Sequence, residues 1–326
     1  VLVDLWRVTS ADRLLHALPI FHAHGLFVAV NTTLLAGAEI IFLPDFKLDR
    51  VIAALPDATT MMGVPTFYTR LLDEPRFTAD LVGNMRLFIS GSAPLLAETH
   101  EAFEARTGHR ILERYGMTET GMNTSNPYDG ERRAGTVGFA LPGVELRITA
   151  EGTDMEVADG EIGIIEVRGP NVFKGYWQMP DKTREELRET GFLITGDLGR
   201  RDADGYLHIV GRNKDLIISG GYNVYPKEIE LVLDEAPWVR ESAAFGVRHP
   251  DFGEGVVAVV VTQPGCKADI AALRDGLFTR LARYKQPKEV IVIDELPRNT
   301  MGKVQKNLLR DMFAKLFTQT TETGTG

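Results

Sequence analysis

Residues 1–125 alternate short apolar runs with helical patterns, and this alternation limits the possible fold more than any other feature of the chain. The runs "TTMMGVP" (59–65) and "RLFISGS" (86–92) predict buried strands, and "LLAETHEAFEART" (95–107) predicts an amphipathic helix. Such alternation predicts a parallel sheet with crossover helices, in which ligands usually bind at the loops after the carboxyl ends of the strands. We therefore expect the chemistry near residues 90–94 and beyond Arg114.

Two other patterns follow along the chain. From about Gly135 to Arg212, short strands separated by Gly-rich turns predict a small antiparallel barrel or sheet. After Lys214, a helix opened by Pro226, the apolar runs "ESAAFGV", "GVVAVVV" and "EVIVIDELP", and two further helices predict an α+β module. The expected fold class is α/β and α+β multidomain, divided into 1–134, 135–213 and 214–317, with a disordered polar tail at 318–326.

Charge and composition exclude several classes of protein. The net charge of -9 and the pI near 5.4 argue against nucleic-acid binding, which would show as a basic stripe. The single Cys266 cannot form an internal disulfide, and its neighbours have no metal-ligand spacing. No apolar run approaches the roughly 18 residues needed to span a bilayer, and no signal-peptide pattern opens the sequence. We expect a soluble, cytoplasmic protein that meets anionic ligands with local groups.

Four separated stretches now matter together: "RYGMTET" (114–120), "TGDLG" (195–199), "GRNKDLIISGGYNVYPKEIE" (211–230) and "PRNTMGKVQKN" (297–307). In order and spacing they resemble the acyl-adenylate-forming enzymes, the superfamily of acyl-CoA synthetases, luciferases and adenylation domains. The resemblance covers nearly the whole chain. It implies a parallel-sheet α/β subdomain, a small β-barrel-like subdomain and a mobile C-terminal α+β lid.

Within that superfamily, "LPIFHAHGLFVA", "MMGVPTFYTRLLDEPRFT", "FISGSAPLLAETH" and "YGMTETGMNTSNPYDG" resemble the malonyl-CoA synthetases. This resemblance implies a ligase that uses ATP, Mg²⁺ and coenzyme A. Malonate would first form malonyl-AMP and pyrophosphate, and thiolysis would then give malonyl-CoA and AMP. The implied partners are small molecules, without nucleic acid or membrane, and the oligomeric state stays open. The rival within the enzyme class is an acyl-CoA synthetase for an aromatic or medium-chain acid.

The resemblance implies three catalytic residues. Thr118 matches the phosphate-binding hydroxyl, and Glu119 matches the Mg²⁺ ligand, as a hard carboxylate oxygen suits a hard cation. Lys303 matches the lysine that bridges the carboxylate and the α-phosphate, and Gly302 beside it frees the backbone. The alternatives are that Thr118 and Glu119 start a helix and that Lys303 is a solvated lysine. A cation is unfavourable at a helix N-terminus, which disfavours the second alternative.

The nucleotide contacts also follow from the resemblance. Asp197 matches the carboxylate that accepts both ribose hydroxyls, although a turn aspartate bonded to its own backbone would explain it too. Arg212 matches a second nucleotide contact. The remaining implied contacts, where the adenine and the phosphates would lie, are Ser92, Ala93 and Pro94, together with Glu113, Arg114, Tyr115, Gly116, Met117 and Thr118.

A short dicarboxylate needs a partner for its far carboxylate, because an unpaired anion in a pocket is costly. Arg70 is the candidate, since an arginine can hold a carboxylate bidentately, and Ser90 could add a hydroxyl. His22 matches a position that gates the acyl pocket, with His24 as the nearby option; in a strand the two would face opposite ways.

The second half-reaction, in which coenzyme A forms the thioester, would involve the predicted module at 214–317. Lys214 matches the pivot about which the lid rotates, as the resemblance implies. Gly220 and Gly221 would line the tunnel for the pantetheine of coenzyme A, where glycine permits close backbone approach. A tight turn would also explain the two glycines.

One part of the family pattern is absent from residues 1–326. The family has a Gly/Ser/Thr-rich phosphate loop that ends in Pro-Lys, and no stretch of this sequence has that composition. The chain therefore resembles the C-terminal two thirds of a synthetase. Two interpretations follow: a piece of a malonyl-CoA synthetase whose residues keep their family roles, or a non-catalytic remnant whose first sheet lacks packing partners.

Overall fold

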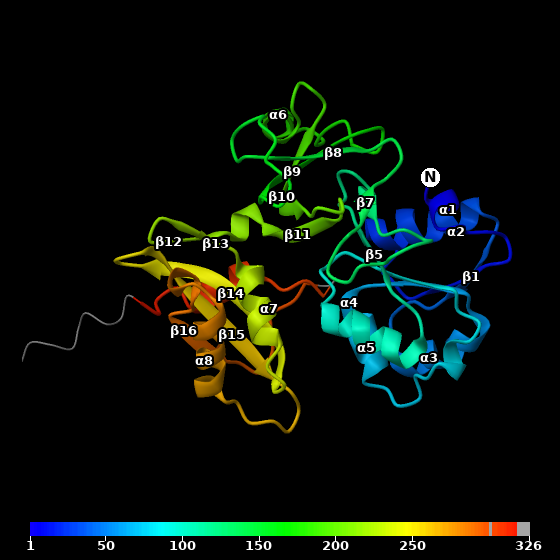
Figure 1. Cartoon of the computed structure of the whole chain (residues 1–326). Coiled ribbons are helices and arrows are strands. Elements are labelled where there is room, and N and C mark those ends of the chain that lie inside the picture. The colour runs from blue at the N-terminus through cyan, green and yellow to red at the C-terminus, as the bar shows by residue number, and fades with distance from the viewer. Residues whose placement is uncertain (300–301, 318–326) are drawn as a thin grey trace, which may run out of the picture. The chain divides into compact units, whose positions relative to one another are not determined.

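The computed structural model describes residues 1–299 and 302–317 (Figure 1). The chain forms two compact units, of which the first comprises 1–195 and 199–209 and the second comprises 196–198 and 210–326. Its described strands form three sheets. The predicted tail at 318–326 lies outside the described residues, and the predicted boundaries at 134 and 213 stay predictions.

The first sheet has the strand order β2-β1-β3-β4-β5-β6-β7. Its strands from β1 to β5 pair in parallel, and β5, β6 and β7 pair antiparallel. Both apolar runs that predicted strands form them, and every residue of β3 and β4 is buried, as in a sheet covered on both faces. The bounds are β1 (Arg13–His16), β2 (Glu39–Phe42), β3 (Thr60–Gly63), β4 (Leu87–Ser90), β5 (Leu112–Tyr115), β6 (Thr124–Ser125) and β7 (Phe139–Ala140).

Helices cover both faces of this sheet, with α1 and α2 above it and α3 to α5 below it in Figure 1. The predicted helix at 95–107 is confirmed as α5, which ends at Gly108 in the left-handed conformation (φ +74°). Tyr68, Phe88 and Phe103 pack edge to face in the core between helices and sheet. The helices are α1 (Leu2–Leu5), α2 (Asn31–Leu35), α3 (Leu48–Ala54), α4 (Pro65–Leu72) and α5 (Ala97–Thr107).

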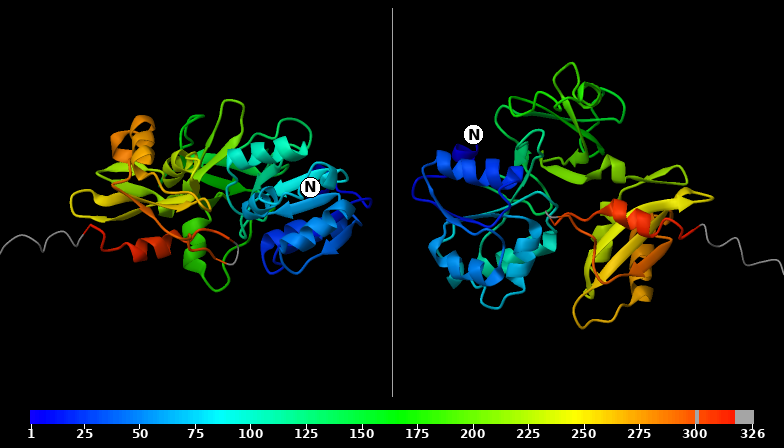
Figure 2. Two further views of the ribbon diagram at one scale, coloured as in Figure 1. Left: turned by 90° about the horizontal axis from the view of Figure 1, so that it is seen from below. Right: turned by 180° about the vertical axis from the view of Figure 1, so that it is seen from behind.

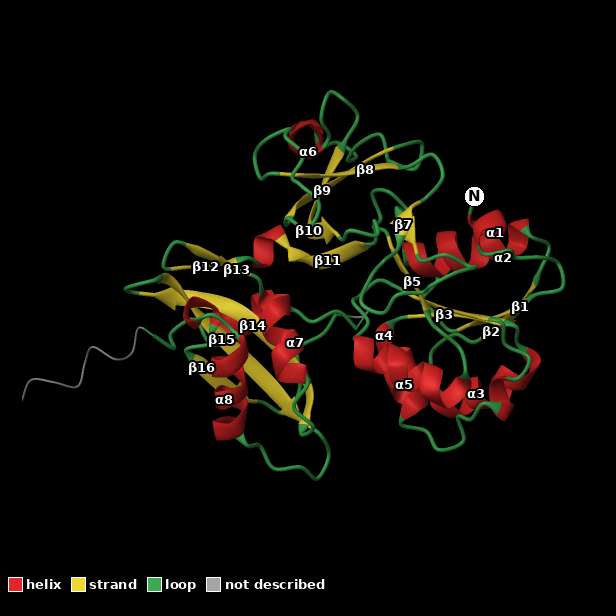
Figure 3. Cartoon of the chain, viewed as in Figure 1, coloured by secondary structure: helices red, strands yellow, loops and turns green. Residues whose placement is uncertain are grey.

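The second sheet has the order β11-β10-β9-β8 and confirms the predicted β-rich region. Strands and loops dominate it, but the sequence patterns gave no sign of α6 (Pro180–Glu186), whose first helical position is a proline (Figure 3). Ile148, Ile165 and Val167 form part of a small separate core. The strands are β8 (Glu145–Thr149), β9 (Gly163–Arg168), β10 (Leu193–Arg201) and β11 (Leu207–Arg212).

The second unit is the predicted α+β module. Its sheet has the order β13-β12-β15-β14, and β16 pairs in parallel with β15. Alternate residues of β14 and β15 pack against α7 and α8 on one face and against α9 on the other, as the period of two in a strand requires. Figure 2 shows α8 in orange and α9 in red on opposite sides of the yellow strands.

The strands of this unit are β12 (Ile217–Ser219), β13 (Tyr222–Val224), β14 (Val239–His249), β15 (Gly253–Thr262) and β16 (Glu289–Val292). Its helices are α7 (Pro226–Asp234), α8 (Ile270–Arg280) and α9 (Lys306–Met312), and Pro226 opens α7 as predicted. In the described part of the chain, no helix has both the length and the apolar character that a bilayer crossing needs.

Candidate functional site

The turn after β4 presents Ser92 in an unusual conformation. Ser92 has a φ of +69°, which non-glycine residues adopt rarely and which often marks a functional turn. Its hydroxyl lies 3.1 Å from Nδ1 of the buried His24. Ala93 is partly exposed and Pro94 is exposed, so this turn offers backbone and small side chains at the carboxyl end of the sheet.

Arg114, at the end of β5, is buried beneath this turn. Its guanidinium lies against Gly91, where any Cβ would overlap it. Burial lowers the pKa of Arg114 to about 10, so the side chain remains a cation at neutral pH. Within residues 1–299 and 302–317, neither Nε nor Nη2 of Arg114 has a hydrogen-bond partner. A buried cation without an anion is unfavourable, so this position is suited to receive one.

Two further polar groups at this end of the sheet are buried and unpartnered among the described residues: the Ser90 hydroxyl and Nε2 of His24. Ser90 pairs with Glu113 across β4 and β5, next to Arg114. Burial, followed by the charge of Arg114, holds the pKa of His24 well below its usual range, so this imidazole is neutral at pH 7. Arginine, serine and neutral histidine together can bind an anionic group.

His22 and Arg70, both expected at the acyl pocket, are not buried at the end of the sheet. Residues His24–Val30 form a π-helical segment rather than a strand. The prediction that the side chains of His22 and His24 face opposite ways assumed a strand, so it does not apply. Partly exposed His22 accepts a hydrogen bond at Nδ1 from the His24 backbone N–H (3.2 Å). Arg70 is exposed in the last turn of α4, with its guanidinium 6.0 Å from the ring centroid of Phe46.

The segment after β5 is a turn. Gly116 is required there, because a Cβ would overlap the carbonyl oxygen of Gly121. No helix starts at Thr118 and Glu119, so the helix-start alternative is wrong. Thr118 is exposed and Glu119 is half-buried, and both are available to a ligand at the end of the sheet.

Glu113 and Tyr115 have packing roles of their own. Glu113 accepts a hydrogen bond from the Gly135 backbone N–H (3.1 Å), and its Oε1 lies 3.4 Å from Nδ1 of His100, at ion-pair range without hydrogen-bond geometry. Burial raises the pKa of Glu113. Tyr115 packs against the core of the second sheet, and Met117 lies partly exposed in the turn. The implied nucleotide contacts of these residues stay predictions.

The sequence patterns missed Tyr176. Its hydroxyl lies 3.1 Å from Oε1 of Glu119, although 57 residues separate the two in the sequence. Tyr176 lies in the loop before α6, and no spacing signal connects it to the motif at 114–120. Only the tertiary structure identifies it.

The donor chemistry at Glu119 fits Mg²⁺. Mg²⁺ is commonly held by one or two carboxylates, several waters and the phosphates of the substrate. Among the described residues, Glu119 forms no ion pair, and no group of three or more His, Cys, Asp or Glu side chains could hold a metal by itself. Glu119 would therefore hold the ion together with nucleotide phosphates.

In the second unit, two of the implied nucleotide contacts are paired with each other. Nη1 of Arg212 donates to Oδ1 of the buried Asp197 (2.8 Å). Asp197 lies within the strand β10, which excludes the turn-aspartate alternative. Lys214 lies in a short 3₁₀ turn, 213–215, directly after β11.

Gly220 and Gly221 form the turn between β12 and β13, with φ values of +59° and +81°. Positive φ at both central residues of a two-residue hairpin requires glycine or a close substitute, so the turn by itself explains the pair. The turn does not exclude a second role beside coenzyme A, which stays a prediction.

Lys303 lies just before α9, and its side chain is exposed. Gly302 has a φ of +74°, as its predicted role in freeing the backbone requires. Asn299 closes the loop, because its side chain accepts the Lys303 backbone N–H (3.0 Å) and its own N–H donates to the Lys303 carbonyl (3.0 Å). The exposed Lys303 side chain is therefore held through its own backbone to Asn299, in the second unit.

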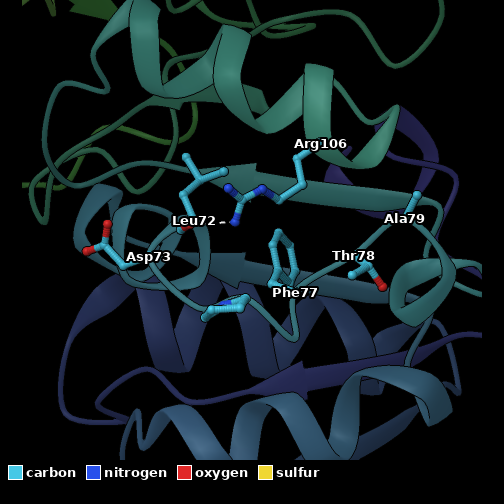
Figure 4. A pocket seen from close by; sticks show the side chains of 7 residues that line it. Leu72, Asp73, Phe77, Thr78, Ala79 and Arg106 are labelled. Carbon is cyan, nitrogen blue, oxygen red and sulfur yellow. Dashed lines mark hydrogen bonds between the residues drawn. The ribbon is translucent and has the colours of Figure 1, made fainter.

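A cavity of about 350 Å³ lies away from these residues, between the end of α4 and α5 (Figure 4). Its lining includes Leu72, Phe77 and Arg106, and the Arg106 guanidinium is already bonded to the Leu72 carbonyl. None of the sequence-predicted site residues lines it. This cavity is therefore not the candidate site.

Comparison with known proteins adds to this geometry. Residues 2–177, more than half of the chain, match the family described as AMP-binding enzyme, and residues 228–303 match the AMP-binding enzyme C-terminal domain. A malonate–CoA ligase of Arabidopsis thaliana is 39% identical over 95% of this chain, and a sulfoacetate–CoA ligase of Cupriavidus necator is 43% identical over 91%. The crystal structure of ATP-bound MatB from Rhodopseudomonas palustris superimposes with a TM-score of 0.95 at 61% identity over 97% of this chain.

The coverage in the other direction is partial. The chain spans 55% of the Arabidopsis relative, 58% of the Cupriavidus relative and 63% of the MatB chain. The similarity confirms the adenylate-forming fold.

Proposed function

The chain belongs to the AMP-binding enzyme family, and from this premise we propose that it is part of an ATP-dependent acid–thiol ligase that forms malonyl-CoA. The reaction would use malonate, ATP and coenzyme A, with malonyl-AMP as the intermediate. The proposal includes a cytoplasmic location and small molecules as the only substrates. The names of the similar proteins support the reaction class, because they describe ligases of short acids and coenzyme A.

The observation that carries the choice of acid is the buried guanidinium of Arg114, whose Nε and Nη2 have no hydrogen-bond partner among the described residues. Malonate has a second carboxylate that must be paired in a pocket, and Arg114 with Ser90 and His24 would supply a cation and two neutral hydrogen-bonding groups. The names of the two relatives are consistent with this choice, since malonate and sulfoacetate both carry a second anionic group. We rank Arg114 above the exposed Arg70 for this role, and His24 above His22. An apolar acid would leave the cation unpaired, which disfavours aromatic and medium-chain substrates.

Several side chains would contact the nucleotide. Thr118 would donate its hydroxyl to a phosphate, and Asp197 would accept the ribose hydroxyls beside Arg212. The adenine would lie against the turn at Ser92, Ala93 and Pro94. Mg²⁺ held at Glu119 would lower the negative charge that opposes attack on the phosphate.

In the first half-reaction, a malonate oxygen attacks the α-phosphorus, and the bond to the β-phosphate oxygen breaks to release pyrophosphate. Lys303 would neutralise the two anions that must approach each other. In the second half-reaction, the coenzyme A sulfur attacks the malonyl carbonyl, and AMP leaves. Rotation of the C-terminal lid about Lys214 would exchange Lys303 for the Gly220–Gly221 hairpin between the two steps.

The test is acid-dependent exchange between ATP and pyrophosphate, with malonate, methylmalonate, phenylacetate and octanoate as acids. It is run on this chain and on a version extended by the N-terminal portion of a related ligase, because the sequence has no phosphate loop. We expect malonate to support the fastest exchange. Faster exchange with phenylacetate or octanoate would overturn the choice of acid, and no exchange in either version would favour the non-catalytic remnant.

Two substitutions separate the residue roles. Arg114→Met should lower malonate-dependent exchange by about 30-fold or more while ATP binding persists, because truncating a buried charge that pairs with a ligand costs ~2 kcal/mol or more. Arg70→Ala is the matched control and should have the smaller effect; the reverse order would return the role to Arg70. Lys303→Ala should lower pyrophosphate release by roughly 100-fold and spare thiolysis of supplied malonyl-AMP.

A further inference from the structure

Tyr176 contacts two carboxylates in the first unit. Its hydroxyl lies within hydrogen-bond distance of both, 2.5 Å from Oε2 of Glu186 and 3.1 Å from Oε1 of Glu119. A phenol carries one hydrogen, so it can donate fully to only one of the two carboxylates at a time. Oε1 of Glu119 therefore shares this hydrogen with Glu186, and Oε2 of Glu119 has no hydrogen-bond partner in the part of the chain that the structure describes.

The charges of the two carboxylates are compensated differently. Nζ of Lys182 lies 3.3 Å from Oε1 of Glu186, four residues along the same helix, and 5.0 Å from the ring centroid of Tyr176. Glu119 has no such cation among the described residues. Lys182 thus offsets the charge of Glu186, and the charge of Glu119 is left for a ligand.

Both Tyr176 and Glu119 are fixed by their backbones. The Phe173 backbone N–H donates to the Glu119 carbonyl (2.8 Å), which joins the loop before α6 to the turn after β5. The Tyr176 N–H donates to the hydroxyl of Thr183 (2.9 Å), and a Cβ on Gly175 would lie 2.7 Å from Thr183 Cγ2. The ring of Tyr176 also packs edge to face on Phe173, with centroids 4.8 Å apart.

From this arrangement we propose that Tyr176 is a positioning residue for Glu119. Its hydroxyl holds one oxygen of the Glu119 carboxylate, so that the second oxygen is presented to the Mg²⁺ that accompanies ATP. Carboxylates that bind metals are commonly oriented by such outer hydrogen bonds. The inference rests on the proposed function, because it assumes that Glu119 serves a magnesium–nucleotide complex.

The experiment measures ATP binding to the chain by calorimetry at increasing Mg²⁺ concentration, and AMP binding without metal. Tyr176→Phe removes only the hydroxyl and should raise the Mg²⁺ concentration at half-maximal ATP binding by about tenfold, the lower end of the effect of losing an outer hydrogen bond. AMP affinity should not change, because Tyr176 is not expected to touch the nucleotide. Trp177→Phe, at a neighbouring side chain that is 85% exposed, is the matched control and should leave both quantities unchanged.

A double-mutant cycle tests whether Tyr176 acts through Glu119. In the Glu119→Gln background, Tyr176→Phe should have no further effect on the Mg²⁺ dependence. An unchanged Mg²⁺ midpoint in Tyr176→Phe, an equal loss of AMP affinity, or a full effect in the Glu119→Gln background would each overturn the inference alone. If neither the unmodified chain nor the extended version binds ATP in the presence of Mg²⁺, both the proposed function and this inference fail.

Discussion

Glu166 and Arg114 are both buried charged side chains of the first unit, and their surroundings differ. Glu166, on β9, is 0% exposed and accepts hydrogen bonds from Arg147 (2.7 and 3.0 Å), Arg188 (2.6 and 2.9 Å) and Thr149 (3.1 Å). Arg114, on β5, is 5% exposed and keeps two nitrogens without a partner among the described residues.

The difference separates two uses of a buried charge. Around Glu166 the fold supplies enough donors to compensate for the lost hydration, as a structural ion cluster requires. At Arg114 the described residues supply no hydrogen-bond partner for Nε and Nη2, so the protein accepts a destabilising group at the carboxyl end of the parallel sheet. Such positions are where ligand sites are found in folds of this kind.

The largest loss of stability is expected at Glu166, which accepts hydrogen bonds from two arginines. Glu166→Ala should lower the free energy of unfolding by about 3 kcal/mol, because it removes the buried carboxylate that two arginines share and leaves them only the exposed carboxylate of Asp154. Urea denaturation followed by the fluorescence of the buried Trp6 measures this. Glu166→Gln keeps an acceptor and should lower the free energy of unfolding by less. If Glu166→Ala were as stable as the unmodified chain, the bonds to Glu166 would not stabilise the fold, and the contrast with Arg114 would be lost.

At Arg114, removal of the charge should raise the free energy of unfolding rather than lower it. Arg114→Met keeps an apolar stem of similar length and removes the buried charge, so we expect unfolding free energy to rise by about 1 to 2 kcal/mol in the absence of ligands. The same denaturation measurement applies. A loss as large as that of Glu166→Ala would mean that Arg114 has a structural partner.

His24, which lies beside the Ser92 turn, should make the stability of the chain depend on pH. Its pKa is lowered in the folded chain, so below about pH 6.5 the unfolded chain binds a proton that the folded chain does not. Stability should therefore fall as the pH drops from 6.5 towards the folded pKa, by up to about 1.4 kcal/mol per pH unit for this one group. His24→Asn should make the dependence shallower when unfolding is measured at a series of pH values. An identical slope in the variant would show that other groups cause the acid sensitivity.

The smallest effect is expected where a charge pair is exposed. Arg274 and Glu289 are 3.2 Å apart, and each side chain is nearly half exposed. Arg274→Ala should change unfolding free energy by about 0.5 kcal/mol or less, because water screens the pair and solvates the remaining carboxylate. A larger loss of unfolding free energy, measured by urea denaturation, would indicate that pairing rather than burial decides how much a charged residue contributes to stability.

Much of the fold follows from local patterns. The runs at 59–65 and 86–92 form β3 and β4, because continuous apolar segments suit strands covered on both faces. Helix α6 was not predicted, since its segment is polar and short. The segment at His24–Val30 also could not be predicted, because a π-helical stretch depends on the packing around it rather than on a sequence period.

The candidate site was predictable only in part. The motif at 114–120 and the loop at Gly302 and Lys303 lie where the order of strands and helices led us to expect them. The choice of Arg70 and His22 rested on the family resemblance and on the place of Arg70 after a strand, and it stays a prediction. The burial of Arg114 and His24 around the Ser92 turn is visible only in the structure. The contact between Tyr176 and Glu119 joins residues 57 apart, which no local pattern connects.

The sequence by itself determined the strands β3 and β4, the helix α5, the turns that require glycine, and the motifs that indicate the family. These features depend on the period of burial and on backbone conformation, which neighbouring residues set. Only the tertiary structure decided which charged groups are compensated: Glu166 with two arginines, Glu119 held by a tyrosine, and Arg114 unpartnered among the described residues. The reason is that hydrogen bonds and ion pairs join side chains from distant segments, and the energy of a buried charge depends on whether the fold brings those segments together.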